Sequence, residues 1–414
     1  MGAPLKRSLQ RHHIDEHLEE LSRLADTAGA EVVGALTQQL DRPNPKTYLG
    51  KGKIDELRQR LDDKHATLVL FDDELSPAQG KNIEDAIGKR VMDRAELIID
   101  IFATRARSNE AKMQVELAQL NYMLPRLTRM WTHLEKFRGG IGMRGPGETQ
   151  LESDRRLIHH RIRVLKERLT EVQRQRETQR QSRRGTFRAS LVGYTNAGKS
   201  SVLRALSGHD VFVEDRLFAT LDPLTREVDL GENNHVLVTD TVGFIRKLPH
   251  HLVASFRATL EEVRDADVLL HVIDASHPTW EEHRLVVDQV LQELGALDRP
   301  VLHVFNKTDA MDHADFAALQ QRVTNLLPDS VFVSAITDGG LEPLKRAILA
   351  RVRAVRPVVD VRVAASAGRV LAELHRTGEV IEERVDGDEM VVRARLDAAL
   401  VGRLRSEGTL VTVV

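Results

Sequence analysis

Hydrophobic positions change their spacing several times along the chain, and each change predicts a different kind of structure. In residues 30–107, short apolar runs alternate with segments of helical periodicity. The runs AEVVGAL (30–36) and ATLVLF (66–71) predict strands, and KIDELRQRL (53–61) and PAQGKNIEDAIG (77–88) predict helices. Strands that alternate with helices are typical of a small parallel sheet covered by helices.

Residues 108–184 follow a heptad spacing instead, which predicts two helices packed along a common seam. The seam positions are Met113, Leu117, Leu120, Leu124, Leu127, Trp131 and Leu134 in the first helix, and Ile158, Ile162, Leu165, Leu169 and Val172 in the second. Five glycines and a proline in residues 139–147 predict a loop between the helices. We expect an antiparallel hairpin with this loop at its tip, a kink at Pro125, and a second helix that starts at a capping box of Thr149 and Glu152.

The remainder of the chain predicts two more domains. Residues 187–355 return to strand–helix alternation. From residue 358 onward the order is strand, helix, strand, strand, helix, strand, with an Asp386-Gly387 turn between the central strands, as in ferredoxin-like folds. The predicted fold class is multidomain α/β: an N-terminal parallel α/β domain (1–107), an antiparallel helical hairpin (108–184), a larger α/β domain (187–355) and a small α+β C-terminal domain (356–414).

A phosphate-binding motif opens the larger α/β domain. The strand FRASLV is followed by GYTNAGKS, which matches G-x-x-x-x-G-K-[ST] between a strand and a helix. In such a loop, backbone N–H groups and the helix N-terminus bind phosphates. Lys199 is expected to reach the β- and γ-phosphates and Ser200 to bind Mg²⁺. The nucleotide-binding residues predicted here are Gly193, Tyr194, Thr195, Asn196, Ala197, Gly198, Lys199 and Ser200.

Four further short motifs follow in the order that a Ras-like P-loop GTPase domain requires. FATLD offers Thr220 as a second Mg²⁺ ligand, and DTVG offers Asp240 behind the metal and the Gly243 N–H for the γ-phosphate. NKTD places the Asp309 carboxylate where it accepts two N–H groups of guanine, which adenine does not present, so GTP is favoured over ATP. SAI presents the Ala335 N–H to the guanine oxygen. The residues in these motifs are Phe218, Ala219, Thr220, Leu221 and Asp222; Asp240, Thr241, Val242 and Gly243; Asn306, Lys307, Thr308 and Asp309; and Ser334, Ala335 and Ile336.

The residue after DTVG raises a question about catalysis. Ras-type enzymes carry a glutamine there that orients the attacking water, but this chain has Phe244, which makes no side-chain hydrogen bond. One interpretation is an inactive GTP-binding switch. The other is that backbone groups orient water and the side chain of Asn196 binds K⁺ beside the phosphates. Asn196 is alternatively only a turn former. The candidate catalytic residues are Lys199, Thr220, Gly243 and Asn196.

Several longer segments resemble the HflX GTPases, within the Obg/HflX group of P-loop translational GTPases. They are YLGKGKIDEL (48–57), DIFATRARSNEAKMQVELAQLNYMLPRL (100–127), GGIGMRGPGETQLESDRR (139–156), GYTNAGKS, FATLDP and DTVGFI. The resemblance covers nearly the whole chain and implies the four-domain fold, binding of GTP and GDP, and binding to the 50S ribosomal subunit and its 23S rRNA. It further implies splitting or rescue of stalled 70S ribosomes under stress, and secondary ATP hydrolysis by the N-terminal domain. A hydrophobic residue after DTVG is usual in this family.

Charge supports an RNA-binding hairpin independently. Residues 144–184 contain twelve Arg or Lys against six Asp or Glu, although the whole chain has a net charge of −2. A basic surface attracts phosphate backbones, whereas a solvated coiled coil with paired arginines is the alternative. The predicted RNA contacts are Arg138, Gly139, Gly140, Arg144, Gly145, Gly147, Arg155 and Arg156.

Composition limits the other function classes. The chain has no cysteine, so disulfide scaffolds and Cys-based zinc sites are excluded, and adjacent histidine pairs lack the spacing of zinc ligands. No run is long and apolar enough to span a membrane. We expect a cytoplasmic monomer, with peripheral association with a membrane left open. The main hypothesis is a ribosome-associated GTPase; the alternative is a GTP-dependent binding switch or a 50S assembly factor without splitting activity.

Overall fold

The computed structural model describes residues 1–4, 13–130, 146–181, 186–209, 214, 216–249, 252, 261–296, 298–407 and 409–413. The chain forms two compact units, which are described separately below. Unit 1 comprises Met1–Gln175 together with the short segments Asp215–Asp222 and Arg246–Ala258. Unit 2 comprises Arg176–Glu214, Pro223–Ile245 and Thr259–Val414. The polypeptide therefore passes from one unit to the other several times.

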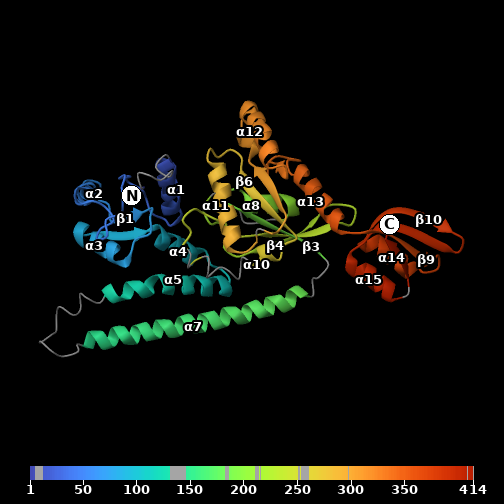
Figure 1. Cartoon of the computed structure of the whole chain (residues 1–414), viewed down its shortest axis with the longest axis horizontal. Helices are drawn as coiled ribbons and strands as arrows, with labels where there is room; N and C mark the ends of the chain where they lie inside the picture. The colour runs from blue at the N-terminus through green and yellow to red at the C-terminus, as the bar shows by residue number, and fades with distance from the viewer. Residues whose placement is uncertain are drawn as a thin grey trace. The chain divides into compact units, whose positions relative to one another are not determined.

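Unit 1 begins with a small α/β domain (Figure 1). Its elements are α1 (Ile14–Thr27), α2 (Lys51–Asp63), β1 (Leu68–Phe71), α3 (Pro77–Ile87), β2 (Arg90–Asp93) and α4 (Arg94–Arg105). β1 and β2 pair in parallel, and the predicted helices 53–61 and 77–88 are confirmed as α2 and α3. A capping box of Ser76 and Gln79 starts α3, and Gly88 ends it with a left-handed backbone.

The predicted strand AEVVGAL is wrong. Residues 31–36 form no strand, and Val32 and Val33 are each 46% exposed. The hydrogen bonds that a neighbouring strand needs are taken by the start of the chain: Gly2 N–H donates to Leu36 O, and Asp72 N–H donates to Met1 O, at 3.0 and 2.9 Å. Met1 thus lies beside the end of β1 in place of the run, and the run meets the N-terminal residues at its own end, Leu36, so residues 31–36 join no ladder.

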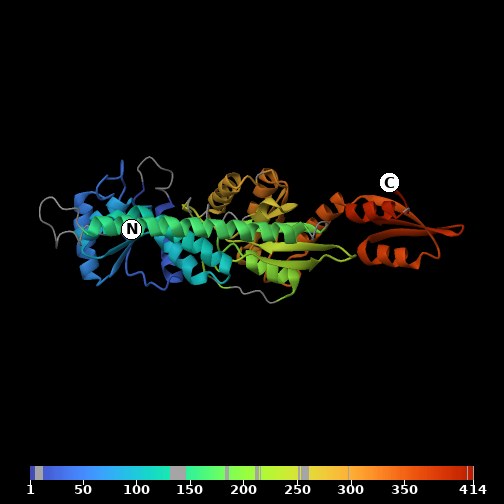
Figure 2. The same ribbon diagram turned by 90° about the horizontal axis from the view of Figure 1, so that it is seen from below.

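The helical hairpin is confirmed as α5 (Asn109–Met130) and α7 (Pro146–Gln181), which lie side by side in both views (Figures 1 and 2). The predicted seam positions pack together, with Leu117, Ile162, Leu165 and Leu169 buried at its centre. Arg161 and Glu116 add a bidentate ion pair across the seam at 2.6 and 2.8 Å. Trp131, Leu134 and the predicted tip loop lie outside the described residues as far as residue 145.

Two details of the hairpin differ from the sequence prediction. α7 begins at Pro146, so Thr149 and Glu152 lie inside the helix and do not start it. Proline favours the first turn of a helix because its missing N–H would have no helical partner there. Pro125 lies inside α5, and the helix continues beyond it to Met130.

Unit 2 contains a three-layer α/β domain whose six-stranded sheet has the order β4-β5-β3-β6-β7-β8, with only β4 antiparallel to its neighbour. α8 and α13 share one buried core with the sheet, and α11 and α12 share another, so the helices cover both faces. The elements are β3 (Phe187–Gly193), α8 (Lys199–Ser207), β4 (Leu224–Asp229), β5 (His235–Asp240), α10 (Glu261–Arg264), β6 (Val268–Asp274), α11 (Trp280–Glu293), β7 (Val301–Asn306), η2 (Thr308–Ala310), α12 (His313–Leu326), β8 (Ser330–Phe332) and α13 (Glu342–Val355).

The C-terminal domain has the predicted order of elements. They are β9 (Val358–Ala364), α14 (Gly368–Thr377), β10 (Glu379–Asp386), β11 (Glu389–Arg395), α15 (Ala398–Ser406) and β12 (Leu410–Val413). The antiparallel sheet has the order β10-β11-β9-β12, and both helices pack on its one apolar face (Figure 1). Gly387 has φ +67 in the turn between the central strands, as the Asp-Gly pair predicts. This is the ferredoxin-like arrangement that the sequence suggested.

Candidate nucleotide-binding site

The phosphate-binding motif lies between β3 and α8, as predicted. Gly193 has φ +153, and a Cβ there would lie 2.2 Å from the carbonyl oxygen of Val272, so only glycine fits. Gly198 has φ +93 directly before α8, and Asn196 has φ +61. Asparagine tolerates this left-handed conformation better than most residues, which gives the turn-former interpretation of Asn196 a structural basis. The ring of Tyr194 stacks on His283 of α11 at 3.8 Å.

Lys199 lies at the centre of the motif and is buried. Its ammonium group donates to the carbonyl oxygens of Gly193 and Tyr194 at 3.1 and 2.9 Å. Burial lowers the pKa of Lys199 to about 8, against the opposing effect of nearby Asp240. A weakly solvated ammonium group in this position is suited to bind an anion such as a phosphate.

Ser200 and Asp240 form the predicted metal-side pair. Ser200 lies in the first turn of α8 and Asp240 at the end of β5, and the Ser200 hydroxyl donates to Asp240 Oδ2 at 2.6 Å. A hydroxyl and a carboxylate are the oxygen donors that Mg²⁺ prefers. Thr220, the other predicted ligand, belongs to a segment of unit 1. Its part in a metal site therefore stays a prediction.

The base-reading motifs meet at the ends of β7 and β8 and connect to the phosphate loop. Asn306 is the link, because its Nδ2 donates to Ala197 O at 3.1 Å and its Oδ1 accepts from Ala335 N–H at 3.2 Å. Ser334 Oγ donates to Asp309 Oδ1 at 2.5 Å, which orients the carboxylate. Lys307 has φ +64 and pairs with Asp274 at 2.7 Å.

Thr308 and Ile336 complete this side of the site. The Thr308 hydroxyl donates to Val333 O at 3.0 Å, so NKTD is held to the residue that directly precedes SAI. The Ile336 side chain is 74% exposed. The structure thus brings together the residues that the sequence assigned to phosphate and guanine within unit 2.

The DTVG segment packs against the phosphate loop. Thr241 Oγ1 donates to Leu191 O at 2.7 Å, and Val242 is buried. The Phe244 backbone pairs with the loop: its N–H donates to Gly193 O at 3.1 Å, and its carbonyl accepts from Thr195 N–H at 2.6 Å. The Phe244 side chain is only 1% exposed. It is therefore a core side chain, and its backbone is the part that meets the loop.

The FATLD segment makes its described contacts in unit 1. Phe218 has φ +56, and its ring packs edge-on against Phe102 of α4 at 4.7 Å. The Asp222 carboxylate accepts from the N–H groups of Arg107 and Ser108 at 3.2 and 3.1 Å, and from the Ser108 hydroxyl. Sequence reasoning missed this role of Asp222 at the start of α5. Ala219, Thr220 and Leu221 lie between these two attachments.

Sequence reasoning also missed a cluster of charges that the residues shortly after DTVG in the chain enter. Arg246 and Lys247 pair with Asp72, which directly follows β1 and is 1% exposed. Arg94 and Glu20 belong to the same cluster. The only sequence signal was an acidic stretch, FDDE, at the end of a predicted strand, and such a stretch is more often solvated.

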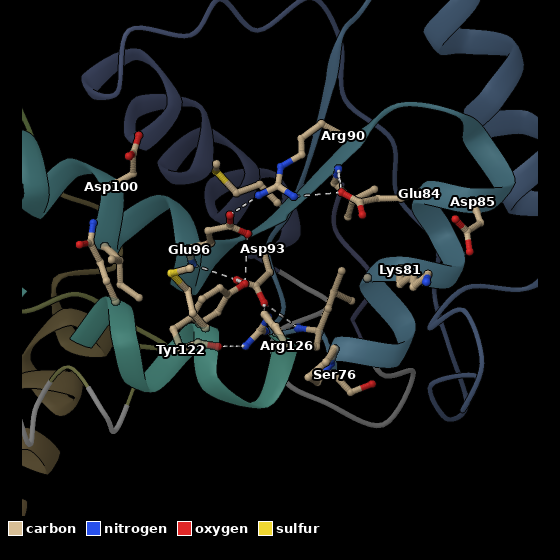
Figure 3. A pocket seen from close by; sticks show the side chains of 18 residues that line it. Ser76, Lys81, Glu84, Asp85, Arg90, Asp93, Glu96, Asp100, Tyr122 and Arg126 are labelled. Atoms are coloured by element: carbon tan, nitrogen blue, oxygen red, sulfur yellow. Dashed lines mark hydrogen bonds and ion pairs between the residues drawn. The ribbon is translucent and has the colours of Figure 1, made fainter. Parts of the chain in front are cut away.

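A cavity of about 610 Å³ lies in unit 1 among α3, β2, α4 and α5 (Figure 3). Its polar floor is internally paired: Tyr122 donates to Asp93 and Glu96 at 3.0 and 3.2 Å, and Arg126 lies over the Tyr122 ring and pairs with Asp93. Burial raises the pKa of both Tyr122 and Glu96. Ser76 lines the cavity, but its capping box occupies the N-terminus of α3. ATP hydrolysis by this domain stays a prediction.

The predicted RNA-contact residues fall into two groups. Arg155 and Arg156 are exposed on α7, and Gly147 lies in its first turn. Arg138, Gly139, Gly140, Arg144 and Gly145 lie outside the described residues. Within the described ranges, no three His, Asp or Glu side chains are grouped to hold a metal ion, and no helix is long and apolar enough to cross a membrane.

Comparison with known proteins covers most of the chain. Family models described as "GTP-binding GTPase N-terminal", "GTP-binding GTPase Middle Region" and "50S ribosome-binding GTPase" match residues 15–103, 105–183 and 188–307. The GTPase HflX of Caldanaerobacter subterraneus is 46% identical over 398 residues, which are 95% of this chain and 90% of that protein. The GTPase HflX of Escherichia coli is 44% identical over 378 residues, which are 91% of this chain and 88% of that protein.

A solved structure is similar as well. It is a GTP-binding protein from the archaeon Sulfolobus solfataricus in complex with GDP, 26% identical, with a TM-score of 0.44 over 85% of this chain and 98% of that chain. The identity of the two bacterial relatives, over nearly their whole lengths, agrees with the three family models and with the order of the motifs. The chain therefore belongs to the HflX family of GTPases.

Proposed function

We propose that this protein hydrolyses GTP and binds the 50S ribosomal subunit through its hairpin, and that it uses this cycle to split or rescue stalled 70S ribosomes. The observation that carries the nucleotide part is the pair of hydrogen bonds made by Asn306, which ties the phosphate loop to the base-reading segment. Asp309 is oriented by Ser334 to accept the N–H groups of guanine. A site built to pair with these groups rejects adenine, because adenine would cover the Asp309 carboxylate without offering it the two N–H donors.

The exposed surface of α7 supports the ribosome part. Its exposed charged residues are mostly basic: Arg155, Arg156, Arg161, Arg163, Lys166, Arg168 and Arg174, against Glu152, Glu167 and Glu171. Rows of Arg and Lys along a helix bind phosphate backbones without reading sequence. The family model described as a 50S ribosome-binding GTPase matches residues 188–307 and supports the large subunit as the partner. Within that subunit, 23S rRNA is the partner proposed for the basic surface of α7.

The hydrogen bond between Ser200 and Asp240 supports Ser200 as a ligand that would hold Mg²⁺. Thr220 is proposed as the second ligand from the FATLD motif alone. When bound, the ion would neutralise charge on the β- and γ-phosphates. The Asn196 side chain would bind K⁺, and its left-handed backbone is the observation that favours the competing turn-former role.

GTP turnover with and without purified 50S subunits tests the proposal. We expect strong stimulation by 50S and conversion of 70S ribosomes into subunits in the presence of GTP. Binding to 50S without stimulation would favour a GTP-dependent switch or an assembly factor instead. Replacing residues 139–147 with a short Gly-Ser turn should leave basal turnover intact and abolish both stimulation and splitting.

A charge reversal on α7 tests the surface itself. The double variant Arg155→Glu and Arg156→Glu should weaken 50S binding. It should also make the fall of log affinity with log salt shallower, by about one to two units of slope. The loss of 50S affinity relative to the wild type should be greatest at low salt. The matched control is Arg403→Glu with Arg405→Glu on α15, which makes the same charge change in the C-terminal domain and should bind 50S as the wild type does. Equal binding by all three proteins would contradict the assignment of α7.

A further inference from the structure

The segment around Gly243 carries contacts in both directions along the chain. On the phosphate-loop side, Phe244 makes the two backbone hydrogen bonds described above. Gly243 itself fits tightly, because a Cβ there would lie 2.7 Å from Cα of Thr195 and 3.1 Å from Nζ of Lys199. These contacts keep Gly243 beside residues that the proposed function assigns to the γ-phosphate.

On the other side, Arg246 and Lys247 enter a group of carboxylates in unit 1 that we call the acidic anchor (Glu20, Asp72 and Asp73). Arg246 lies 3.0 Å from Asp72 through Nη2 and 3.0 Å from Glu20 through Nε. Lys247 Nζ lies 2.8 Å from Asp72 Oδ2 and 2.6 Å from Asp73 Oδ1. The chain therefore meets two cationic attachments directly after it leaves unit 2 at Ile245.

Asp72 is the centre of the acidic anchor. Arg94 adds a third cation at 2.9 Å, and the carboxylate is almost completely buried. Burial by itself would raise the pKa of Asp72, but the three cations together hold it well below its usual range. The carboxylate is therefore ionised, and removing one partner from such a buried group leaves charge uncompensated.

Lys247 shows that the attachment constrains the backbone as well. It has φ +53, in the left-handed region that non-glycine residues rarely adopt. Such a conformation persists only where surrounding contacts hold it. The ammonium group of Lys247 donates to Asp72 and Asp73, so the acidic anchor supplies contacts that hold this backbone conformation.

We propose that the acidic anchor is a positioning element for GTP hydrolysis: acting through Arg246 and Lys247, Asp72 fixes residues 240–245 so that Gly243 stays beside the phosphate loop. This inference rests on the proposed GTPase function. Phe244 and Ile245, which separate Gly243 from Arg246, are both buried, so a shift at Arg246 is passed on to Gly243 through a short, packed stretch. A misplacement of about 1 Å can lower a rate on the order of 100-fold.

Basal GTP turnover of the full chain, without ribosomes, tests the inference. Lys247→Asn removes the ion pairs, whereas asparagine still tolerates the left-handed backbone. The variant therefore measures the effect of the lost ion pairs without a change in backbone preference. We expect kcat for GTP to fall about tenfold or more, with GDP affinity unchanged. Arg246→Met should behave in the same way. Lys247→Arg keeps the charge and should retain most of the wild-type kcat.

The control is Arg90→Met, which removes a cation from unit 1 that pairs with Glu84 and Glu96. It should turn over GTP at the wild-type rate. Asp72→Asn tests the centre of the acidic anchor. Its melting temperature is measured as well, because the change lies in a buried cluster. If Asp72→Asn does not fold, the Lys247 variants alone decide the inference. A wild-type kcat in Lys247→Asn, or an equal loss of GDP affinity, would overturn the inference. A wild-type protein that does not hydrolyse GTP at all would instead overturn the proposed function.

Discussion

The base-reading loops and the segments that would sense the γ-phosphate are held in different ways. NKTD and SAI lie at the ends of adjacent strands of one sheet, and their hydrogen bonds run to the phosphate loop of the same unit. FATLD makes its described contacts in unit 1, and DTVG is continuous with Arg246 and Lys247, which are also bound there. Affinity for the nucleotide is thus expected to be a property of unit 2, whereas the response to the γ-phosphate is expected to depend on unit 1 as well.

The largest effect is expected on the base-reading side. In Asp309→Asn an amide donor replaces a carboxylate acceptor, so GDP affinity should fall on the order of 1000-fold and xanthine nucleotides should be bound in its place. Calorimetric titration with GDP and XDP measures this change. The kcat for XTP in the variant should match the wild-type kcat for GTP, because the switch segments are untouched. Wild-type GDP affinity in the variant would show that Asp309 does not read the base.

A smaller effect is expected from pH at Lys199. Its pKa is lowered to about 8 by burial, so the nucleotide-free protein loses this positive charge as the pH rises through that value. Phosphate binding requires the ammonium form, so GDP and GTP affinity should fall about tenfold per pH unit above pH 8. Lys199→Ala should abolish tight binding at every pH. Lys199→Arg stays charged and should lose the pH dependence; a slope that survives in this variant would assign the proton to another group.

A still smaller effect is expected where FATLD meets the hairpin. Ser108 caps the start of α5, since its Oγ accepts from Ala111 N–H at 3.0 Å and donates to Asp222. Ser108→Ala removes a capping contact of about 1 kcal/mol and should lower kcat for GTP about fivefold, with unchanged GDP affinity. Thr104→Ala is the matched control, because it removes a hydroxyl that donates to Ile101 O within α4. A fall in GDP affinity would place Asp222 with the nucleotide-binding residues rather than with the hairpin.

The smallest effect is expected from the monovalent cation. If Asn196 binds K⁺, turnover in K⁺ should exceed turnover in Na⁺ by a few-fold, and the difference should disappear when the amide is removed. Asn196→Gly is the sharper variant, because glycine keeps the left-handed backbone at φ +61 without strain. Equal rates in the two salts for the wild type would leave Asn196 as a turn former and assign water positioning to the backbone alone.

Local patterns in the sequence were sufficient for most of the fold. The strand before Gly193 and the helix after Lys199 were predicted because the motif needs a strand, a tight turn and a helix in direct succession. The hairpin seam followed from heptad spacing, and Leu117 and Leu165 are buried in it as expected. The run at residues 30–36 was predicted wrongly, because its apolar pattern matched a strand while its hydrogen-bond partners went to Met1–Pro4.

The sequence by itself determined the order of the elements, the phosphate and guanine motifs, and the seam of the hairpin, because each depends on residues close together in the chain or on a regular period. Only the tertiary structure decided which segments hold DTVG and FATLD. Asp72 and Lys247 are 175 residues apart in the sequence, and no periodic pattern connects them. Charged side chains in a linear sequence give no indication of their partners, since burial and distance, which decide the strength of an ion pair, exist only after the chain has folded.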